Sequence, residues 1–356
     1  MIWNALRASG WAAMAVIAGL AFGAGPVSAS GHRVNMIDFS DLQGWDSDDH
    51  QAALRVFQAS CPVISKARPD EDWSTLCALA ETATDARSFF ERFFRPVVVG
   101  NPSEALFTGY YEPELLASST RTGQYNVPLY AVPPEVRSGP LPWATRAEIE
   151  TGNLLEGRGL EIAWLKDPVE AFFLQVQGSG RLKLTDGSVL RVGFGGKNGH
   201  EYRSVGKELV RRGVYEPHQV SAQMIKNWVR RNPEEGRLLL HHNPSFVFFR
   251  EVKNVALQDG PLGAIQVPLT EGRSLAVDPV HVPLGAPVWL EKAGANPFNR
   301  LMVAQDTGSA IKGQQRADVF FGSGDAAGRQ AGRTKDGGRM VVLLPIESAF
   351  AADPGL

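Results

Sequence analysis

The spacing of hydrophobic residues changes along the chain and divides it into three regions. Between residues 47 and 94, apolar residues recur at helical intervals, with Leu54 and Phe57 following a capping residue, Asp48. We therefore expect a helical amino-terminal region.

From about residue 116 to 250, short strand-like runs alternate with short helices. A capping box from Thr145 to Glu148, closed by Gly152, marks one of these helices. Three apolar runs are interpreted as strands: 171–177, 181–184 and 189–192. This alternation predicts a separate middle domain.

After about residue 255 the pattern is almost entirely strands and turns. Six runs are interpreted as strands: 263–269, 274–277, 287–291, 300–305, 318–321 and 339–344. So many short strands predict a small closed barrel, because closure removes exposed sheet edges. The 37 glycines and 23 prolines suit the turns such a fold needs. The expected fold class is mainly β with amino-terminal helices.

The amino terminus has the pattern of an export signal. Arg7 precedes an apolar stretch at 11–23, and Val27-Ser28-Ala29 places small residues at the cleavage positions. The alternative is a membrane anchor, but the apolar stretch is shorter than the ~20 residues that cross a bilayer. We expect cleavage after residue 29 and no transmembrane span in the mature chain.

Charge and composition argue against two classes of function. The 36 basic and 38 acidic residues nearly balance, without the Lys/Arg cluster of a nucleic-acid binder. The chain has no His-Glu-x-x-His motif, and His241 and His242 are adjacent, so on a strand they would face opposite ways. We expect no nucleic acid, no metal and no cofactor.

Cys61 and Cys77 are the two cysteines of the chain. In an oxidising compartment an even pair favours a disulfide, and the alternative is two buried free thiols.

Three aspartates lie at strand ends or beside turns in the last third of the chain: Asp278, Asp306 and Asp318. Strand alternation sends Asp318 to the face opposite Ala317 and Val319, beside an aromatic residue. A carboxyl next to apolar surface has a raised pKa, which suits a general acid. The alternative is an aspartate paired with Lys312 or Arg316 on a solvated strand.

Two glycine-rich segments carry amide and hydroxyl groups that suit hydrogen bonding to sugars. One contains Gln177 and Ser179, and the other contains Asn198. Both are equally typical of tight hairpin turns. Tyr110 and Tyr111 either stack on sugar rings or cover the edge of the core.

Five separated motifs, taken together, resemble one family of cell-wall enzymes. They lie at 107–113, 172–181, 197–204, 243–249 and 304–313. In this order and spacing the sequence closely resembles the membrane-bound lytic transglycosylase A (MltA) family, whose members cleave the glycan of bacterial peptidoglycan.

The resemblance implies a two-domain molecule in which residues 30–115 and 253–350 build a double-psi β-barrel. A second β-rich domain, 116–252, is inserted between these two parts, and glycan binds in the groove where the domains meet. The carboxyl-terminal part is similar to the three-aspartate (3D) domain, named for carboxylates that match Asp278, Asp306 and Asp318.

The resemblance also implies the chemistry. Asp318 matches the proposed sole acid/base of the family. In the implied reaction the 6-hydroxyl of N-acetylmuramic acid attacks the anomeric carbon of the same sugar and forms a 1,6-anhydro ring. Asp306 is expected to support it. The expected groove contacts are Tyr111, Gln177, Ser179, Asn198 and Lys312.

The implied partners are peptidoglycan glycan strands, with other cell-wall enzymes as further candidates. The family's founding members carry a lipobox cysteine that is absent here. The expected location is the periplasm, with association to the outer membrane left open.

Two other functions compete with this interpretation. A hydrolase on the same barrel would use Asp318 as acid and Asp306 as base. A non-catalytic glycan-binding module would need no acid at Asp318.

Overall fold

The computed structural model describes residues 34–67 and 72–353. The predicted export signal at 1–29 lies outside the described residues. Within the described ranges, no helix is long and apolar enough to cross a membrane.

The amino-terminal elements are one short strand, then the helices, then two further strands. The strands here are β1 (Val34–Met36), β2 (Phe94–Val99) and β3 (Leu106–Glu112). The helices are α1 (His50–Ala67), α2 (Asp72–Thr82) and α3 (Ala86–Phe93), with 3-10 turns η1 (Phe39–Asp41), η2 (Trp45–Ser47) and η3 (Pro102–Glu104).

The middle region mixes strands and helices. Its strands are β4 (Glu114–Ser118), β5 (Val127–Tyr130), β6 (Glu161–Leu165), β7 (Gly180–Leu184), β8 (Val189–Lys197) and β9 (Val247–Glu251). Its helices are α4 (Pro134–Ser138), α5 (Arg146–Thr151), α6 (Pro168–Gln177), α7 (Val205–Arg211), α8 (Ala222–Arg231) and α9 (Pro233–His241).

The last third is dominated by strands. They are β10 (Ser274–Val277), β11 (Pro287–Lys292), β12 (Phe298–Asp306), β13 (Arg316–Ser323), β14 (Lys335–Asp336) and β15 (Gly338–Pro345). Two helices accompany them, α10 (Gly324–Arg333) and α11 (Ile346–Ala352).

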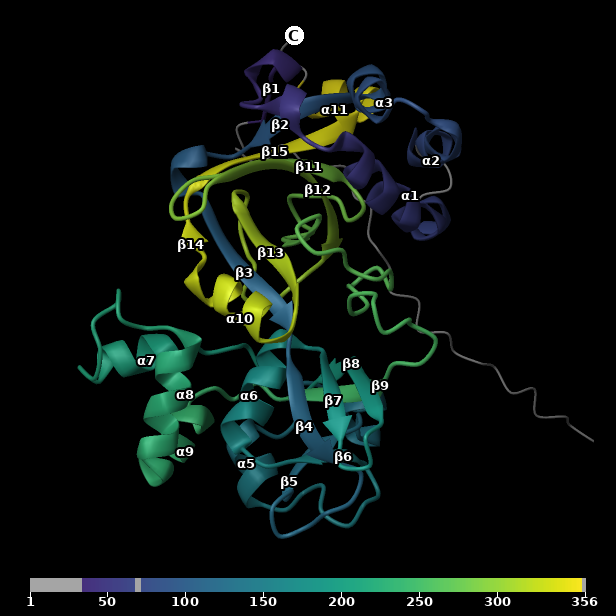
Figure 1. Cartoon of the computed structure of the whole chain (residues 1–356). Coiled ribbons are helices and arrows are strands. Elements are labelled where there is room, and N and C mark those ends of the chain that lie inside the picture. Colours follow the sequence, from purple (N-terminus) through teal and green to yellow (C-terminus); the bar gives the residue numbers. More distant parts are fainter. Residues whose placement is uncertain (1–33, 68–71, 354–356) are drawn as a thin grey trace, which may run out of the picture. The chain divides into compact units, whose positions relative to one another are not determined.

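The described strands form two sheets. The first has the order β1-β2-β15-β11-β12-β10-β13-β3-β14 and curves into a nearly closed barrel (Figure 1). The second has the order β5-β6-β4-β7-β8-β9. The expected mainly β fold with amino-terminal helices is confirmed.

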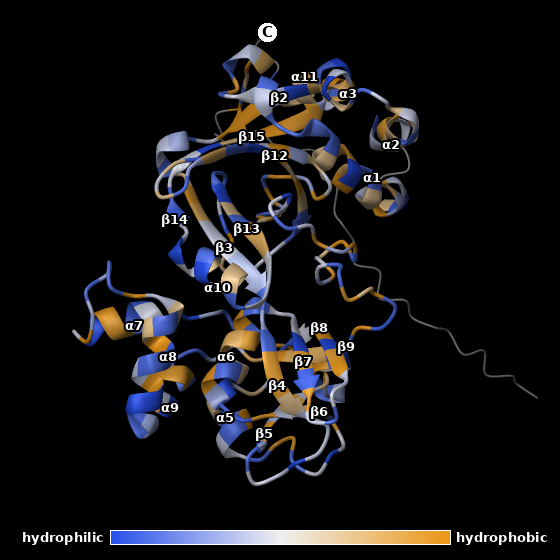
Figure 2. Cartoon of the chain, viewed as in Figure 1, coloured by the Kyte–Doolittle hydropathy of each residue, from blue (hydrophilic) through white to orange (hydrophobic). Residues whose placement is uncertain are grey.

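The barrel core combines residues from both ends of the chain. Trp289 of β11 and Phe57 of α1 are fully buried in one hydrophobic cluster together with Phe107 of β3. Figure 2 shows the hydrophobic colouring along β12, β13 and β15, the strands that supply much of this core. The helices and the carboxyl-terminal strands therefore fold as one unit.

Two strand predictions were wrong. Residues 171–177 belong to α6, whose start is fixed by Asp167, which accepts a hydrogen bond from the N–H of Val169, and by Pro168. Its end is fixed by Gly178 at φ 79°. A short apolar run does not distinguish a strand from a buried helix, and here the capping residues decide.

The predicted strand at 263–269 is instead a tight turn. The N–H of Gln266 donates to the carbonyl of Gly263 at 2.9 Å, and Gln266 adopts φ 59°. A Cβ on Gly263 would lie 2.6 Å from the carbonyl oxygen of Gln305. The glycine therefore lets this turn pack directly against β12.

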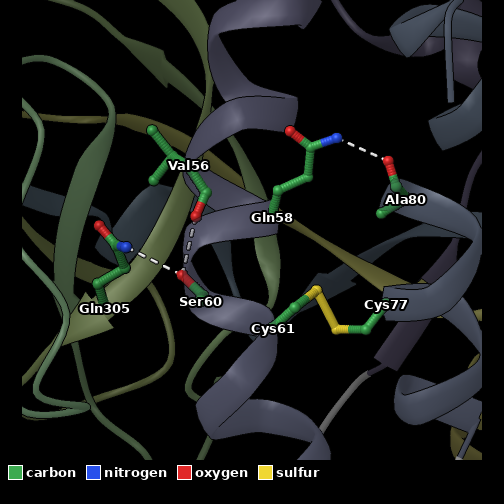
Figure 3. Close-up of a disulfide and its surroundings, with 7 residues drawn as sticks. All are labelled: Val56, Gln58, Ser60, Cys61, Cys77, Ala80 and Gln305. Atoms are coloured by element: carbon green, nitrogen blue, oxygen red, sulfur yellow. Dashed lines mark hydrogen bonds between the residues drawn. A yellow bond between two sulfur atoms is a disulfide. The ribbon is translucent and has the colours of Figure 1, made fainter. Parts of the chain in front are cut away.

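Cys61 of α1 and Cys77 of α2 form a disulfide with an S–S distance of 2.10 Å (Figure 3). Next to it, the hydroxyl of Ser60 accepts a hydrogen bond from Nε2 of Gln305 at 2.9 Å. The disulfide-linked helices thus contact the end of β12.

A buried ionic group connects the two sheets. Glu112, the last residue of β3, has 0% exposure and contacts Nε of Arg181 at 2.7 Å and Nε of Arg191 at 3.0 Å. The hydroxyl of Ser323 donates to the same carboxylate at 2.8 Å. We call Glu112, Arg181, Arg191 and Ser323 the junction cluster.

Candidate functional site

One row of residues across the barrel sheet carries two of the three aspartates. Ala276 of β10 pairs in register with Asp306 of β12 on one side and with Asp318 of β13 on the other. Asp318 pairs in turn with Thr108 of β3. Residues in register on neighbouring strands point to the same face of a sheet. We call Asp306, Ala276, Asp318 and Thr108 the carboxyl row.

The spacing within the row follows from strand geometry. Asp306 and Asp318 are two strands apart, which places their Cα atoms roughly 10 Å from each other. The residue between them on β10 is alanine, so this position contributes only a methyl group to the space between the carboxyls.

A break in strand register brings Asp306 into the row. Leu275 pairs with Ala304, but Ala276 pairs with Asp306, so Gln305 is passed over. Gln305 is instead fully buried and donates to Ser60. Bulges of this kind redirect a side chain to the other face of a sheet.

Asp318 is a half-buried residue whose carboxyl has one polar neighbour in hydrogen-bond contact. The hydroxyl of Thr108 donates to its Oδ1 at 2.5 Å, and Nη2 of Arg316 donates to the Thr108 oxygen at 2.8 Å. Burial raises the pKa of Asp318, and the Thr108 hydrogen bond and the Arg316 charge only partly oppose this. The group is suited to holding a proton.

Asp306 is fixed by backbone donors. Its Oδ1 accepts hydrogen bonds from the N–H groups of Ala264 and Thr307, each at 2.9 Å. Burial raises its pKa to about 6, and the charge of Asp318 acts in the same direction. Asp306 therefore changes its charge near physiological pH.

Tyr110 lies on the same face, two residues beyond Thr108 on β3. Its ring centroid is 5.3 Å from that of Phe320, and its buried hydroxyl lies next to the Asp306 carboxyl. Burial raises its pKa well above 10, and the charges of Asp306 and Asp318 add to this effect. Its hydroxyl therefore stays protonated beside the two carboxyls.

Tyr111, the tyrosine expected to contact substrate, lies on the other face of β3. A Cβ on Gly328 of α10 would be 2.8 Å from its ring, so α10 packs against it. The structure does not place Tyr111 with Asp318. Strand alternation would have pointed to Thr108 and Tyr110 instead, since both share the face of the carboxyl row.

Asp278 has a different environment from the other two aspartates. Its Oδ2 accepts from the N–H of Gly313 at 3.0 Å, and its Oδ1 lies 3.4 Å from Nζ of Lys312. Burial alone would raise its pKa, but the backbone donors Gly313 and Val280 and the Lys312 charge hold it below its usual value. Lys312 thus pairs with Asp278, while Nη2 of Arg316 reaches the hydroxyl of Thr108.

The other predicted contacts are dispersed over the second sheet and α6. Gln177 accepts a hydrogen bond from the N–H of Tyr111 at 3.2 Å, and Ser179 lies half-buried beyond α6. Asn198 has 0% exposure, and its amide donates to the carbonyls of Ala144 and Pro244, each at 2.8 Å. Its side chain stabilises a loop and has no surface to offer a ligand, contrary to the expectation.

Within residues 34–67 and 72–353, no group of three or more His, Cys, Asp or Glu residues is arranged to hold a metal ion. The chemistry available at the carboxyl row is proton transfer and charge stabilisation by two carboxyls, one threonine and one tyrosine.

Two family models match the chain. The MltA specific insert domain matches residues 106–250, and the 3D domain matches residues 273–344.

Curated relatives carry the same family name. The chain is 40% identical over 259 residues to membrane-bound lytic murein transglycosylase A of Escherichia coli strain K12, covering 70% of this chain and 68% of the relative. The Vibrio cholerae protein of that name is 35% identical over 264 residues, covering 70% and 69%.

Solved structures agree with this similarity. A membrane-bound lytic murein transglycosylase from Agrobacterium tumefaciens matches with a TM-score of 0.79 and 34% identity, covering 89% of this chain and 98% of that one. E. coli MltA with bound chitohexaose matches with a TM-score of 0.69 and 30% identity, covering 85% and 90%.

Proposed function

The chain belongs to the family of membrane-bound lytic murein transglycosylase A, and from this we propose that it is a peptidoglycan lytic transglycosylase. It cleaves the β-1,4 bond between N-acetylmuramic acid and N-acetylglucosamine and leaves 1,6-anhydro-N-acetylmuramic acid ends. The observation that carries this proposal is the carboxyl row, where a half-buried carboxyl of raised pKa lies across one alanine from a second carboxyl.

Asp318 acts as acid and then as base. Its proton passes to the glycosidic oxygen as the bond from that oxygen to the anomeric carbon breaks. The 6-hydroxyl of the same sugar attacks the anomeric carbon, and its proton returns to the Asp318 carboxylate. Because nucleophile and electrophile belong to one sugar, no second carboxylate is needed to activate water.

Asp306 supports this reaction by charge. With a pKa of about 6 it is mostly a carboxylate at neutral pH. A carboxylate across the row from Asp318 stabilises the positive charge that develops on the sugar ring in the oxocarbenium-like transition state.

The same position of Asp306 favours one competing function. Inverting hydrolases hold their two carboxyls ~6.5–9.5 Å apart so that a water fits between them. The roughly 10 Å between the Cα atoms is compatible with such a spacing. The second candidate function is therefore a hydrolase with Asp306 as its base.

Glycan binding is proposed for the exposed polar residues around this chemistry. Lys312 has a 61% exposed side chain, and Ser179 is partly exposed, so both have surface for sugar hydroxyls. The chitohexaose bound to the E. coli relative supports a glycan strand as the ligand.

We further propose the division into 30–115, 116–252 and 253–350, with the first and last parts in one barrel. The relatives are named membrane-bound. An export signal at 1–29 would place this chain in the periplasm, next to its substrate.

The experiment that tests the function is mass spectrometry of the products released from peptidoglycan sacculi by the purified protein. Products with 1,6-anhydro ends, each lighter by one water than a hydrolysis product, are expected. Reducing ends would instead favour the hydrolase with Asp306 as base. Binding to sacculi without release of product would favour a non-catalytic module.

A further inference from the structure

Thr108 lies between a positive charge and the catalytic carboxyl, and its hydrogen bonds have a fixed direction. Nη2 of Arg316 is 2.8 Å from the Thr108 oxygen, and that oxygen is 2.5 Å from Oδ1 of Asp318. A guanidinium only donates hydrogen bonds, so it occupies a lone pair of the threonine oxygen. A second lone pair remains on that oxygen, but the Arg316 charge polarises the hydroxyl and favours it as a donor, so its single hydrogen is directed to Asp318.

This direction makes the two oxygens of Asp318 unequal. Oδ1 accepts the hydrogen bond from Thr108, and Oδ2 receives none from the described residues. An oxygen that already accepts a strong hydrogen bond is the poorer site for a proton, so the acidic proton resides on Oδ2.

We propose that Thr108 and Arg316 form a positioning relay that places the transferable proton of Asp318 on Oδ2. The same relay steadies the Asp318 carboxylate after the proton has left. This inference rests on the proposed function, which gives Asp318 its two roles, and it assigns the residues that prepare it for them.

Arg316 is held so that it acts through the hydroxyl. Its Nη1 donates to the backbone carbonyls of Leu106 and Ala317 at 3.2 and 2.5 Å. Among the described residues Arg316 forms no salt bridge with the Asp318 carboxyl, although its charge still acts on that group. A direct ion pair would lower the pKa of an aspartate by 1–3 units and remove its proton. The intervening hydroxyl keeps the charge close without this loss.

Other charged groups near Asp318 are accounted for. From the same face it meets Asp306 of β12, Tyr110 of β3 and Arg316 of its own strand. Lys335 of β14 is next to Thr108 in the row and is exposed. Asp278, the residue after the end of β10, contacts Lys312 and Gly313.

Helix α10 does not face this group. It packs on the opposite face of β3, where a Cβ on Gly109 would lie 2.8 Å from the backbone of Ala331. Among the described residues, Asp306, Tyr110 and Arg316 are therefore the charged or titratable groups next to Asp318 on its own face of the sheet, with the exposed Lys335 one strand further along.

The test compares Thr108→Val, which keeps the side-chain shape but removes the hydroxyl, with Thr108→Ser, which restores it. Rates of anhydro-product release are measured across pH. In Thr108→Val, kcat is expected to fall roughly 10- to 100-fold with little change in KM. The alkaline limb of the profile is expected to move up by about one pH unit, because the carboxylate loses its hydrogen bond. Thr108→Ser is expected to restore both.

A second measurement separates the relay from the proposed function. NMR titration of the aspartate carboxyls, with Asp318→Asn to assign the Asp318 signal, reads its pKa without any turnover. The relay predicts a higher pKa in Thr108→Val and a near wild-type pKa in Thr108→Ser. An unchanged pKa in Thr108→Val overturns the relay even if the enzyme is active. Absence of anhydro products from the wild-type protein overturns the proposed function. The titration still tests the relay, because it compares the Asp318 pKa in wild type and Thr108→Val without turnover.

The matched control is Thr151→Val, on the exposed surface of α5, where the hydroxyl donates to the carbonyl of Ala147. The chemical change is identical, but Thr151 lies on α5 in the middle region, outside the carboxyl row. We expect its rate and pH profile to match the wild type. An equal shift in both valine variants would mean that the effect does not come from the relay.

Discussion

The carboxyl row and the junction cluster both withdraw carboxyl groups from solvent on the barrel sheet, but they surround them differently. Glu112 of the junction cluster has 0% exposure, yet two arginines and one hydroxyl contact it. Asp318 of the carboxyl row has one hydroxyl in hydrogen-bond contact, and burial raises its pKa.

This difference separates carboxylates that stabilise the fold from carboxyls that can transfer a proton. Burial disfavours the charged form of a carboxyl unless cations and donors compensate for lost water. Where two cations lie against the carboxylate, the group holds elements together, as Glu112 joins β3 and β13 to β7 and β8. Where compensation is incomplete, the group keeps a proton that it can transfer.

Replacing the central carboxyl of the row gives the largest expected change in activity. Asp318→Asn cannot donate or accept the transferred proton, so the rate of anhydro-product release should fall by at least 10³-fold. Its free energy of unfolding should not decrease, because an amide avoids the cost of burying a charge. Rates from mass spectrometry and urea unfolding of the same sample measure both. A variant with substantial activity would contradict the role of Asp318.

The corresponding change in the junction cluster should act on stability instead. Glu112→Gln leaves Arg181 and Arg191 without their shared anion, and removing one partner of a buried ion pair costs about 3–5 kcal/mol. Urea unfolding at neutral pH measures this loss. The control is Glu156→Gln, whose contact with Arg121 at 3.4 Å is exposed and should contribute less than about 1 kcal/mol. Equal losses in both variants would refute the distinction between the two regions.

Asp306→Asn tests whether desolvation of the Asp306 charge lowers the free energy of unfolding. The folded-state pKa of Asp306 is about 6, against an ordinary value of 3.8. A raised pKa means that the folded state binds its proton more tightly, so stability falls as pH rises from about 4 through 6. The asparagine variant avoids this loss and should be more stable than wild type by up to roughly 3 kcal/mol at pH 7.5.

At pH 3.5 the two proteins should be nearly equal in stability, because Asp306 is then protonated in the folded state and mostly protonated in the unfolded state. Urea unfolding at the two pH values is the measurement. A variant that is less stable than wild type at pH 7.5 would show that the Asp306 charge is fully compensated. The rate at neutral pH should fall on the order of 10- to 100-fold, because charge stabilisation in the transition state is lost.

Much of the fold was predictable from the sequence because local patterns determine it. The helices before residue 94 and the runs at 274–277 and 287–291 correspond to elements of the structure. The run at 171–177 was misread because a short apolar segment fits both a strand and a buried helix, and only Asp167 and Gly178 at its ends distinguish them.

The carboxyl row itself could be predicted only in part. Alternation on one strand placed Asp318 on the face away from Ala317, but its partners depend on pairings between distant segments. Thr108 lies 210 residues away in the chain, and Asp306 enters the row only through the register shift at Ala276. Such long-range pairing and bulges leave no local signal in the sequence.

Substituting Asp278 by asparagine gives the smallest expected change in the free energy of unfolding. The sign of this change is opposite to that for Asp306. The pKa of Asp278 is lowered, because the donors Gly313 and Val280 and the Lys312 charge outweigh burial. A lowered pKa means that the stabilisation is present above the ordinary aspartate pKa and is lost as pH falls through the folded value. Asp278→Asn should therefore cost roughly 1 kcal/mol at pH 7.5, reduced because Lys312 is largely exposed.

Urea unfolding of Asp278→Asn at pH 7.5 and pH 3.5 completes the comparison among the aspartates. The loss of unfolding free energy in Asp278→Asn should shrink as pH falls. The gain in unfolding free energy in Asp306→Asn should shrink over the same pH range. Lys312→Met removes the charge and leaves the Gly313 donor, so it should reproduce only part of the loss. A stabilised Asp278→Asn would mean that Asp278, like Asp306, is a carboxyl buried without adequate partners. Asp278 would then belong with Asp306 and Asp318 among the carboxyls that lack full compensation, and not with Glu112.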